Sequence, residues 1–117
     1  MAIRYFPAAR NDIKAAVKWS AENSGQPASL RYQKLLAVAI AEIAANPELT
    51  HSYKVLGLPA GIRLYHLKHS RTRAALDGQI VKEPRHLVAY TVRAGQTAIV
   101  RLLHERMEIT RQLKDAL

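Results

Sequence analysis

Two long helical patterns with almost nothing between them constrain the fold of this chain more than any other feature of its sequence. Residues 8–24 repeat small and apolar side chains at three- and four-residue spacing, and residues 27–45 do so over a much broader arc. Only Gly25-Gln26 separates the two patterns, and Asn46-Pro47 ends the second. Helices joined by so short a link fold back on each other, so the sequence predicts an antiparallel helical hairpin.

Runs rich in β-forming residues lie on both sides of this hairpin. Residues 3–6, closed by Pro7, predict a first strand at a sheet edge, because proline cannot donate a ladder hydrogen bond. Residues 61–67, 86–92 and 97–104 predict three more strands, and consecutive strands favour antiparallel pairing. The last of these runs is apolar on both faces, so we expect it to be a central strand under the helices.

A strand, two helices and then three strands is the order of an α+β protein. The predicted fold is an N-terminal strand, an antiparallel helical hairpin and a three-stranded antiparallel run that completes a small twisted sheet, all in one domain covering residues 1–117. Residues 48–60 are expected to be mostly loop. Residues 68–85 form a basic, irregular segment with a turn at Asp77-Gly78, and residues 105–117 are either a final helix or a flexible tail.

The formal charge of the whole chain is +9, and most of this positive charge lies in its second half. Residues 1–53 hold six basic and four acidic side chains, whereas residues 54–117 hold twelve and five. An excess of that sign attracts phosphate backbones or an acidic protein partner. The plainer alternative is a solvated basic surface that only aids solubility.

The composition excludes several kinds of protein. Cysteine is absent, which excludes disulfides, cysteine-based zinc sites and a cysteine nucleophile, and agrees with a cytoplasmic location. The first residues lack the apolar core of a signal peptide, and no run approaches the roughly 18 apolar residues of a membrane span. His66 and His69 have a His-x-x-His spacing with no cysteine or carboxylate nearby, which makes a poor metal site. We therefore expect neither a metal nor another cofactor.

Short motifs along nearly the whole chain resemble those of the RelE/ParE toxin superfamily. They include the entry to the first helix, the proline after the second helix, a G-x-R at a strand, an R-H-x-x-x-Y strand and a ParE-like ending. In chain order these motifs are Ala9-Arg10-Asn11-Asp12-Ile13, Asn46-Pro47, Gly61-Ile62-Arg63, Arg85-His86-Leu87-Val88-Ala89-Tyr90 and Ile99-Val100-Arg101-Leu102-Leu103-His104-Glu105-Arg106-Met107.

The resemblance implies the toxin of a type II toxin–antitoxin system, of the kind used in plasmid stabilisation, in a hetero-oligomer with a cognate antitoxin. ParE-like members inhibit DNA gyrase by binding it, whereas RelE-like members are metal-independent endonucleases that cut mRNA on the ribosome. The long hairpin and the ending at residues 102–107 favour the ParE-like activity. The basic insertion at residues 68–85 departs from the family pattern, and a non-toxic nucleic-acid-binding domain is a third alternative.

The two activities place function on different residues. If the chain is a nuclease, its candidate catalytic residues are Arg63, Arg101 and His104, because guanidinium groups stabilise a phosphorane and imidazole transfers protons near neutral pH. The wider set of candidate contacts to a target or to nucleic acid is Arg63, Lys68, Arg71, Arg73, Arg85, Tyr90, Arg101 and Arg106. Packing within the sheet is the structural alternative for Tyr90.

The second helix is apolar over so broad an arc that it needs cover on more than one side. An antitoxin is one candidate cover, and the chain's own sheet and first helix are the other. The candidate antitoxin-binding residues are Tyr32, Leu35, Leu36 and Ile43. Trp19, on the first helix, is expected to pack inside the hairpin.

Overall fold

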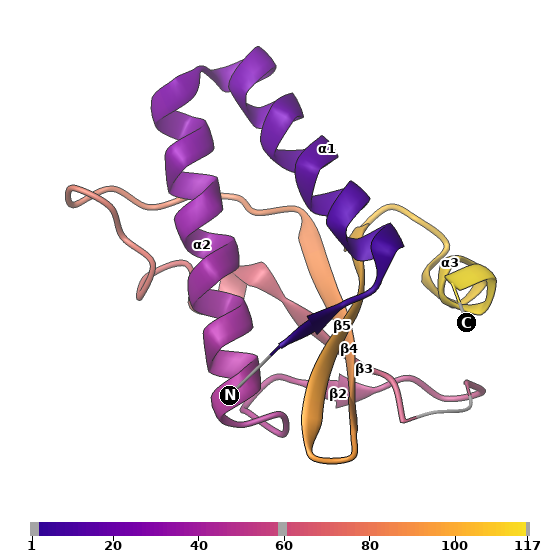
Figure 1. Ribbon diagram of the computed structural model, residues 1–117. Helices are drawn as coiled ribbons and strands as arrows, with labels where there is room; N and C mark the ends of the chain where they lie inside the picture. Colours follow the sequence, from indigo (N-terminus) through magenta and orange to yellow (C-terminus); the bar gives the residue numbers. More distant parts are fainter. Residues whose placement is uncertain (1–2, 59–60, 117) are drawn as a thin grey trace.

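The fold is a five-stranded sheet with a long helical hairpin over one face and a short C-terminal helix against the other (Figure 1). The computed structural model describes residues 3–58 and 61–116. Its elements in chain order are β1 Arg4–Tyr5, α1 Pro7–Ser24, α2 Gln26–Ala45, β2 Tyr53–Lys54, β3 Arg63–His66, the 3-10 helix η1 Leu67–Ser70, β4 His86–Arg93, β5 Gln96–His104 and α3 Ile109–Ala116. No helix within the described ranges is long and apolar enough to cross a membrane.

The strand order β1-β5-β4-β3-β2 confirms the α+β class but makes the sheet mixed. β3, β4 and β5 form the predicted antiparallel run. β1 lies at the predicted edge, yet it pairs in parallel with β5, with Arg4 opposite Ala98. β5 is an interior strand, but the central position belongs to β4, and β2 adds a short strand where only loop was expected.

The predicted helical hairpin is confirmed, and one glycine makes its turn (Figure 1). Gly25 is the whole link between α1 and α2, and its φ of 85° lies in the left-handed region that favours glycine. Its N–H donates to the Ala21 carbonyl, and its carbonyl accepts from the N–H of Ser29. A single residue thus supplies a hydrogen bond to the end of one helix and to the start of the next.

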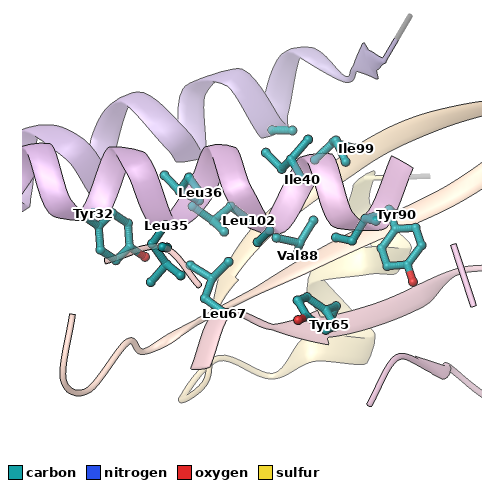
Figure 2. Close-up of a cluster of buried hydrophobic side chains, with 14 residues drawn as sticks. Tyr32, Leu35, Leu36, Ile40, Tyr65, Leu67, Val88, Tyr90, Ile99 and Leu102 are labelled. Carbon is teal, nitrogen blue, oxygen red and sulfur yellow. The ribbon is translucent and has the colours of Figure 1, made fainter. Parts of the chain in front are cut away.

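The larger core lies between α2 and the sheet (Figure 2). Leu35, Leu36 and Ile40 of α2 pack with Val88 of β4 and Leu102 of β5. Fully burying one aliphatic side chain of this kind contributes about 1.5–3 kcal/mol. The chain's own sheet and α1 therefore cover the broad apolar arc of the second helix.

A smaller core lies on the opposite face of the sheet. Ile62, Val100 and Leu103 are buried there, together with Leu113 of α3. Ile109, at the start of α3, packs against the same cluster. Of the two alternatives for the last residues of the chain, the helix is the one observed.

Candidate functional site

A groove of about 900 Å³ opens between the helical hairpin and the segment that precedes β4. Ala15, Ala16 and Trp19 of α1 line one side, and residues 79–86 line the other, with Met107 contributing as well. Trp19 is 65% exposed and Met107 is 44% exposed, so the groove presents apolar surface to solvent. The expectation that Trp19 packs inside the hairpin is wrong, because its side chain projects off the apolar stripe of α1.

Three polar rings line the groove where β4 begins and β5 ends. The hydroxyl of Tyr32 is hydrogen-bonded to Nδ1 of His86, and the ring of His104 meets that of His86 edge-on at a centroid distance of 5.3 Å. Burial lowers the pKa of His86 to about 4, and positive charge on His104 and His66 acts in the same direction. Burial also raises the pKa of Tyr32. At neutral pH the Tyr32–His86 pair is therefore uncharged.

Cationic side chains border this apolar surface. Arg31, Lys82 and Arg85 all line the groove. Arg85 is partly neutralised, because it donates to Glu105 at 2.9 Å and to Glu83 at 3.1 Å. Arg31 and Lys82 have no ion-pair partner in the part of the chain that the structure describes. An apolar groove with a cationic border fits an amphipathic segment that carries acidic side chains.

A second, smaller hollow of about 320 Å³ lies beside the groove and is lined by Lys68, Arg71 and Arg85, along with two carboxylates. Residues 83–85 line both hollows, so they form the wall between them. The predicted turn at Asp77-Gly78 is confirmed: both residues have positive φ, between the paired residues Leu76 and Gln79.

The three candidate catalytic residues do not meet. Arg63 lies opposite Tyr90 of β4, whereas His104 lies opposite His86 at the start of the same strand. Four residues of strand separate those positions, which is about 13 Å along the sheet. Arg63 donates instead to the Oγ of Ser52 at 2.7 Å and to its carbonyl at 3.1 Å. The set predicted from the sequence therefore forms no common centre.

Arg101 has a structural partner that the sequence did not reveal. Its Nε donates to Asp12 Oδ2 at 2.6 Å and its Nη2 donates to Oδ1 at 3.0 Å. This hydrogen bonding raises the pKa of Arg101. Asp12 Oδ2 also accepts the backbone N–H of Leu102 at 3.0 Å, beyond the short stretch where β1 pairs with β5. The ion pair thus covers an edge of β5 that would otherwise be open to pairing with another chain.

Two other predicted contact residues, Tyr90 and Arg73, have partners within the fold. Tyr90 is fully buried and donates to the carbonyl of Pro47 at 2.5 Å, so the packing alternative holds for it. The guanidinium of Arg73 is bound to Glu42 and to the carbonyl of His69. Its hydrogen bonds lower the pKa of Glu42. Arg106 remains exposed after the end of β5.

Of the four candidate antitoxin-binding residues, Tyr32 lines the groove, whereas Leu35, Leu36 and Ile43 belong to the core and do not line it. Tyr32 is 8% exposed, Leu36 is 4% exposed, and Leu35 and Ile43 are fully buried (Figure 2). The regular spacing of apolar residues in α2 correctly predicted that this face is buried, but the chain's own sheet buries it. Three predicted site residues, Tyr32, Arg85 and His104, line the groove, whereas Trp19 and Met107 were not predicted to do so. One signal in the sequence pointed to Trp19. Trp19 lies off the apolar stripe of its helix, one turn after the small side chains of Ala15 and Ala16.

His66 and His69 do not belong to a metal site among the described residues. Nε2 of His66 is hydrogen-bonded to Glu105 at 2.9 Å, and the ring of His69 stacks on that of His51 at a centroid distance of 4.1 Å. Among the described residues, no group of three or more histidine or acidic side chains is arranged to hold a metal ion.

Comparison with protein families agrees with the resemblance seen in the motifs. The model of the family described as "ParE toxin of type II toxin-antitoxin system, parDE" matches residues 3–109. No curated protein matches the chain. The match spans both helices of the hairpin and all five strands, and reaches the start of α3. The chain belongs to the ParE toxin family of type II toxin–antitoxin systems.

Proposed function

We propose that this toxin inhibits DNA gyrase by binding to it, and that its antitoxin neutralises it by placing an acidic, amphipathic segment in the groove beside the hairpin. Family membership supports a toxin that pairs with an antitoxin. The groove supports the location of the partner, and the separation of Arg63 from His104, with Arg101 held by Asp12, supports action by binding.

The observation that carries the proposal is the pairing of exposed apolar surface with unneutralised positive charge in the groove. Trp19 and Met107 are large side chains left exposed beside small ones on α1. Aromatic anchors of this kind dominate the binding energy of protein interfaces. Arg31 and Lys82 add charge complementarity, which favours rapid association with an acidic partner.

A RelE-like nuclease would need a general acid or base close to the cations that stabilise the phosphorane. Arg63 and His104 lie about 13 Å apart along the sheet, by their register at about 3.3 Å per residue. Arg101 is held by Asp12. The geometry therefore favours binding over mRNA cleavage as the mode of action.

The target is tested with purified protein in two parallel reactions. One follows supercoiling and DNA cleavage by gyrase, and the other follows mRNA cleavage on translating ribosomes. We expect dose-dependent gyrase inhibition and intact mRNA. Unchanged supercoiling at toxin concentrations well above that of gyrase would reject the target, and codon-phased mRNA cuts would replace it with the ribosome.

The groove is tested with the antitoxin encoded beside the toxin gene. Trp19→Glu places a charge among the apolar residues and should weaken antitoxin binding at least tenfold, as expected for a hot-spot residue worth about 2 kcal/mol or more. The matched control is Leu30→Glu, because Leu30 is 46% exposed on α2 and does not line the groove. Equal losses in both variants would place the antitoxin elsewhere.

A further inference from the structure

The basic segment between β3 and β4 presents positive charge outside the groove, whereas its partly exposed apolar residues Ile80 and Val81 line the groove. Of the cationic side chains in the described residues, ion pairs bind three: Arg73, Arg85 and Arg101. Lys68, Arg71 and Lys82 are exposed and have no such partner there. With Arg85 they form what we call the basic cluster.

The fold holds the basic cluster in a fixed arrangement. Lys68 and Arg71 lie in and just after η1, beside Leu67 and Ser70, which are fully buried. The Nη1 of Arg71 donates to the carbonyl of Lys82 at 2.9 Å, which joins the two halves of the segment. A backbone fixed in this way avoids the cost of ordering a loop when the cations bind.

Two carboxylates lie in the same hollow but do not cancel the cluster. Glu105 is hydrogen-bonded to His66 and Arg85, which lowers its pKa, and Glu83 is bound to Arg85. Both acids are therefore paired with Arg85 or a histidine, and the charges of the two lysines and of Arg71 remain available.

The kinds of side chain exposed on the basic segment indicate which class of partner it would bind. Every exposed residue from 66 to 85 is polar, charged or glycine, so outside the groove this surface lacks the aromatic and apolar anchors of a protein interface. Residues 66–86 also contain no phenylalanine, tyrosine or tryptophan on which an unpaired base could stack. A rigid cationic surface without such side chains suits the phosphate backbone of a duplex.

We propose that the basic cluster binds the phosphate backbone of duplex DNA without sequence preference. The binding itself is a property of the free toxin. Its cellular role rests on the proposed function: it would hold the toxin beside the DNA on which gyrase acts. The cluster shares the wall at residues 83–85 with the groove, so an acidic antitoxin segment in the groove would weaken its hold on DNA.

The test measures binding of the purified toxin to a fluorescent DNA duplex over a series of salt concentrations. Release of counterions by about three phosphate contacts predicts a log–log slope near −3 and about a 40-fold loss of affinity between roughly 50 and 200 mM salt. The double variant Lys68→Glu/Lys82→Glu should bind at least tenfold more weakly at the lower salt. Its matched control is Lys14→Glu/Lys18→Glu, which changes the net charge equally on exposed positions of α1 and should cost less than threefold.

Three results would overturn the proposal: no duplex binding at low salt, equal losses in the two double variants, or tenfold tighter binding of single-stranded DNA or RNA than of the duplex. If the glutamate variant does not fold, as judged by circular dichroism, Lys68→Gln/Lys82→Gln should reduce the slope by about two. Gyrase assays with the same proteins separate the two claims. If the toxin inhibits gyrase but does not bind DNA, only the DNA-binding role of the basic cluster is rejected. If it binds DNA but does not inhibit gyrase, only gyrase as the target is rejected.

Discussion

The two faces of the sheet are covered very unequally. Two helices of 18 and 20 residues lie on one face, which carries the larger core and the groove. A helix of eight residues, α3, covers the other face (Figure 1). Among its described side chains, that of Leu113 is fully buried. The difference teaches that the main core and the groove proposed for the antitoxin share the hairpin face, whereas α3 is a local cover that we expect to be lost without unfolding of the rest of the fold.

The largest effect is expected from Leu35→Ala on the hairpin face. Leu35 is fully buried, so the cavity should lower the free energy of unfolding by about 2–5 kcal/mol in urea titrations. Leu30→Ala, at a 46% exposed position on the same helix, should change it by no more than about 0.5 kcal/mol. Similar losses in the two variants would contradict the assignment of the main core.

Asp12→Ala should have the next largest effect, because it removes the cover from the edge of β5. The change leaves the Arg101 guanidinium and the Leu102 N–H without their partner, which we expect to lower the free energy of unfolding by about 1–3 kcal/mol. Glu22→Ala, at an exposed position of the same helix, is the control. Soluble oligomers of the Asp12 variant, seen by light scattering, would show that the open edge now pairs between chains.

Acid should loosen the hairpin face. The pKa of His86 in the folded protein, about 4, is below its ordinary value of 6.5, so its contribution is complete above pH 6.5 and is lost as the pH falls toward 4. The loss at pH 5 should be about 1–2 kcal/mol. Comparing the urea midpoints at pH 7 and pH 5 with those of His86→Gln isolates this residue from His69, whose pKa is also lowered. An equal acid loss in the variant would assign the effect to other groups.

Leu113→Ala should have the smallest effect on global stability, about 1 kcal/mol, because an eight-residue helix can undock instead of unfolding the domain. Hydrogen exchange should lose protection over residues 109–116 and remain unchanged in α2. If Leu113→Ala lowers the free energy of unfolding as much as Leu35→Ala does, the two faces of the sheet unfold as one cooperative unit and the contrast between them is wrong.

Patterns within short stretches of the sequence predicted the helices and strands whose formation depends mainly on neighbouring residues. Helical periodicity and the glycine link predicted the hairpin, and alternating β-formers predicted β3, β4 and β5. The partners of each element were harder to predict, because periodicity shows that a face is buried but not what buries it. For this reason the sequence predicts partner contacts for Leu35 and Leu36, which are core residues, and does not predict the pairing of Asp12 with Arg101. The distance between Arg63 and His104 depends on strand register, which neither residue reveals in the sequence.

The parallel pairing of β1 with β5 has a consequence for how the protein is made. Arg4 and Tyr5 find their partners only at Ala98 and Ile99, near the end of the chain. Pairing across so long a stretch slows folding, because the loop must close before the contacts form. During synthesis the pairing of β1 with β5 therefore cannot form until residues 98 and 99 have been made. A chain that stopped before residue 98 would lack the partner of β1 and also Leu102, His104 and Met107 of the groove, so the sheet edge and the groove would be completed by the same late segment.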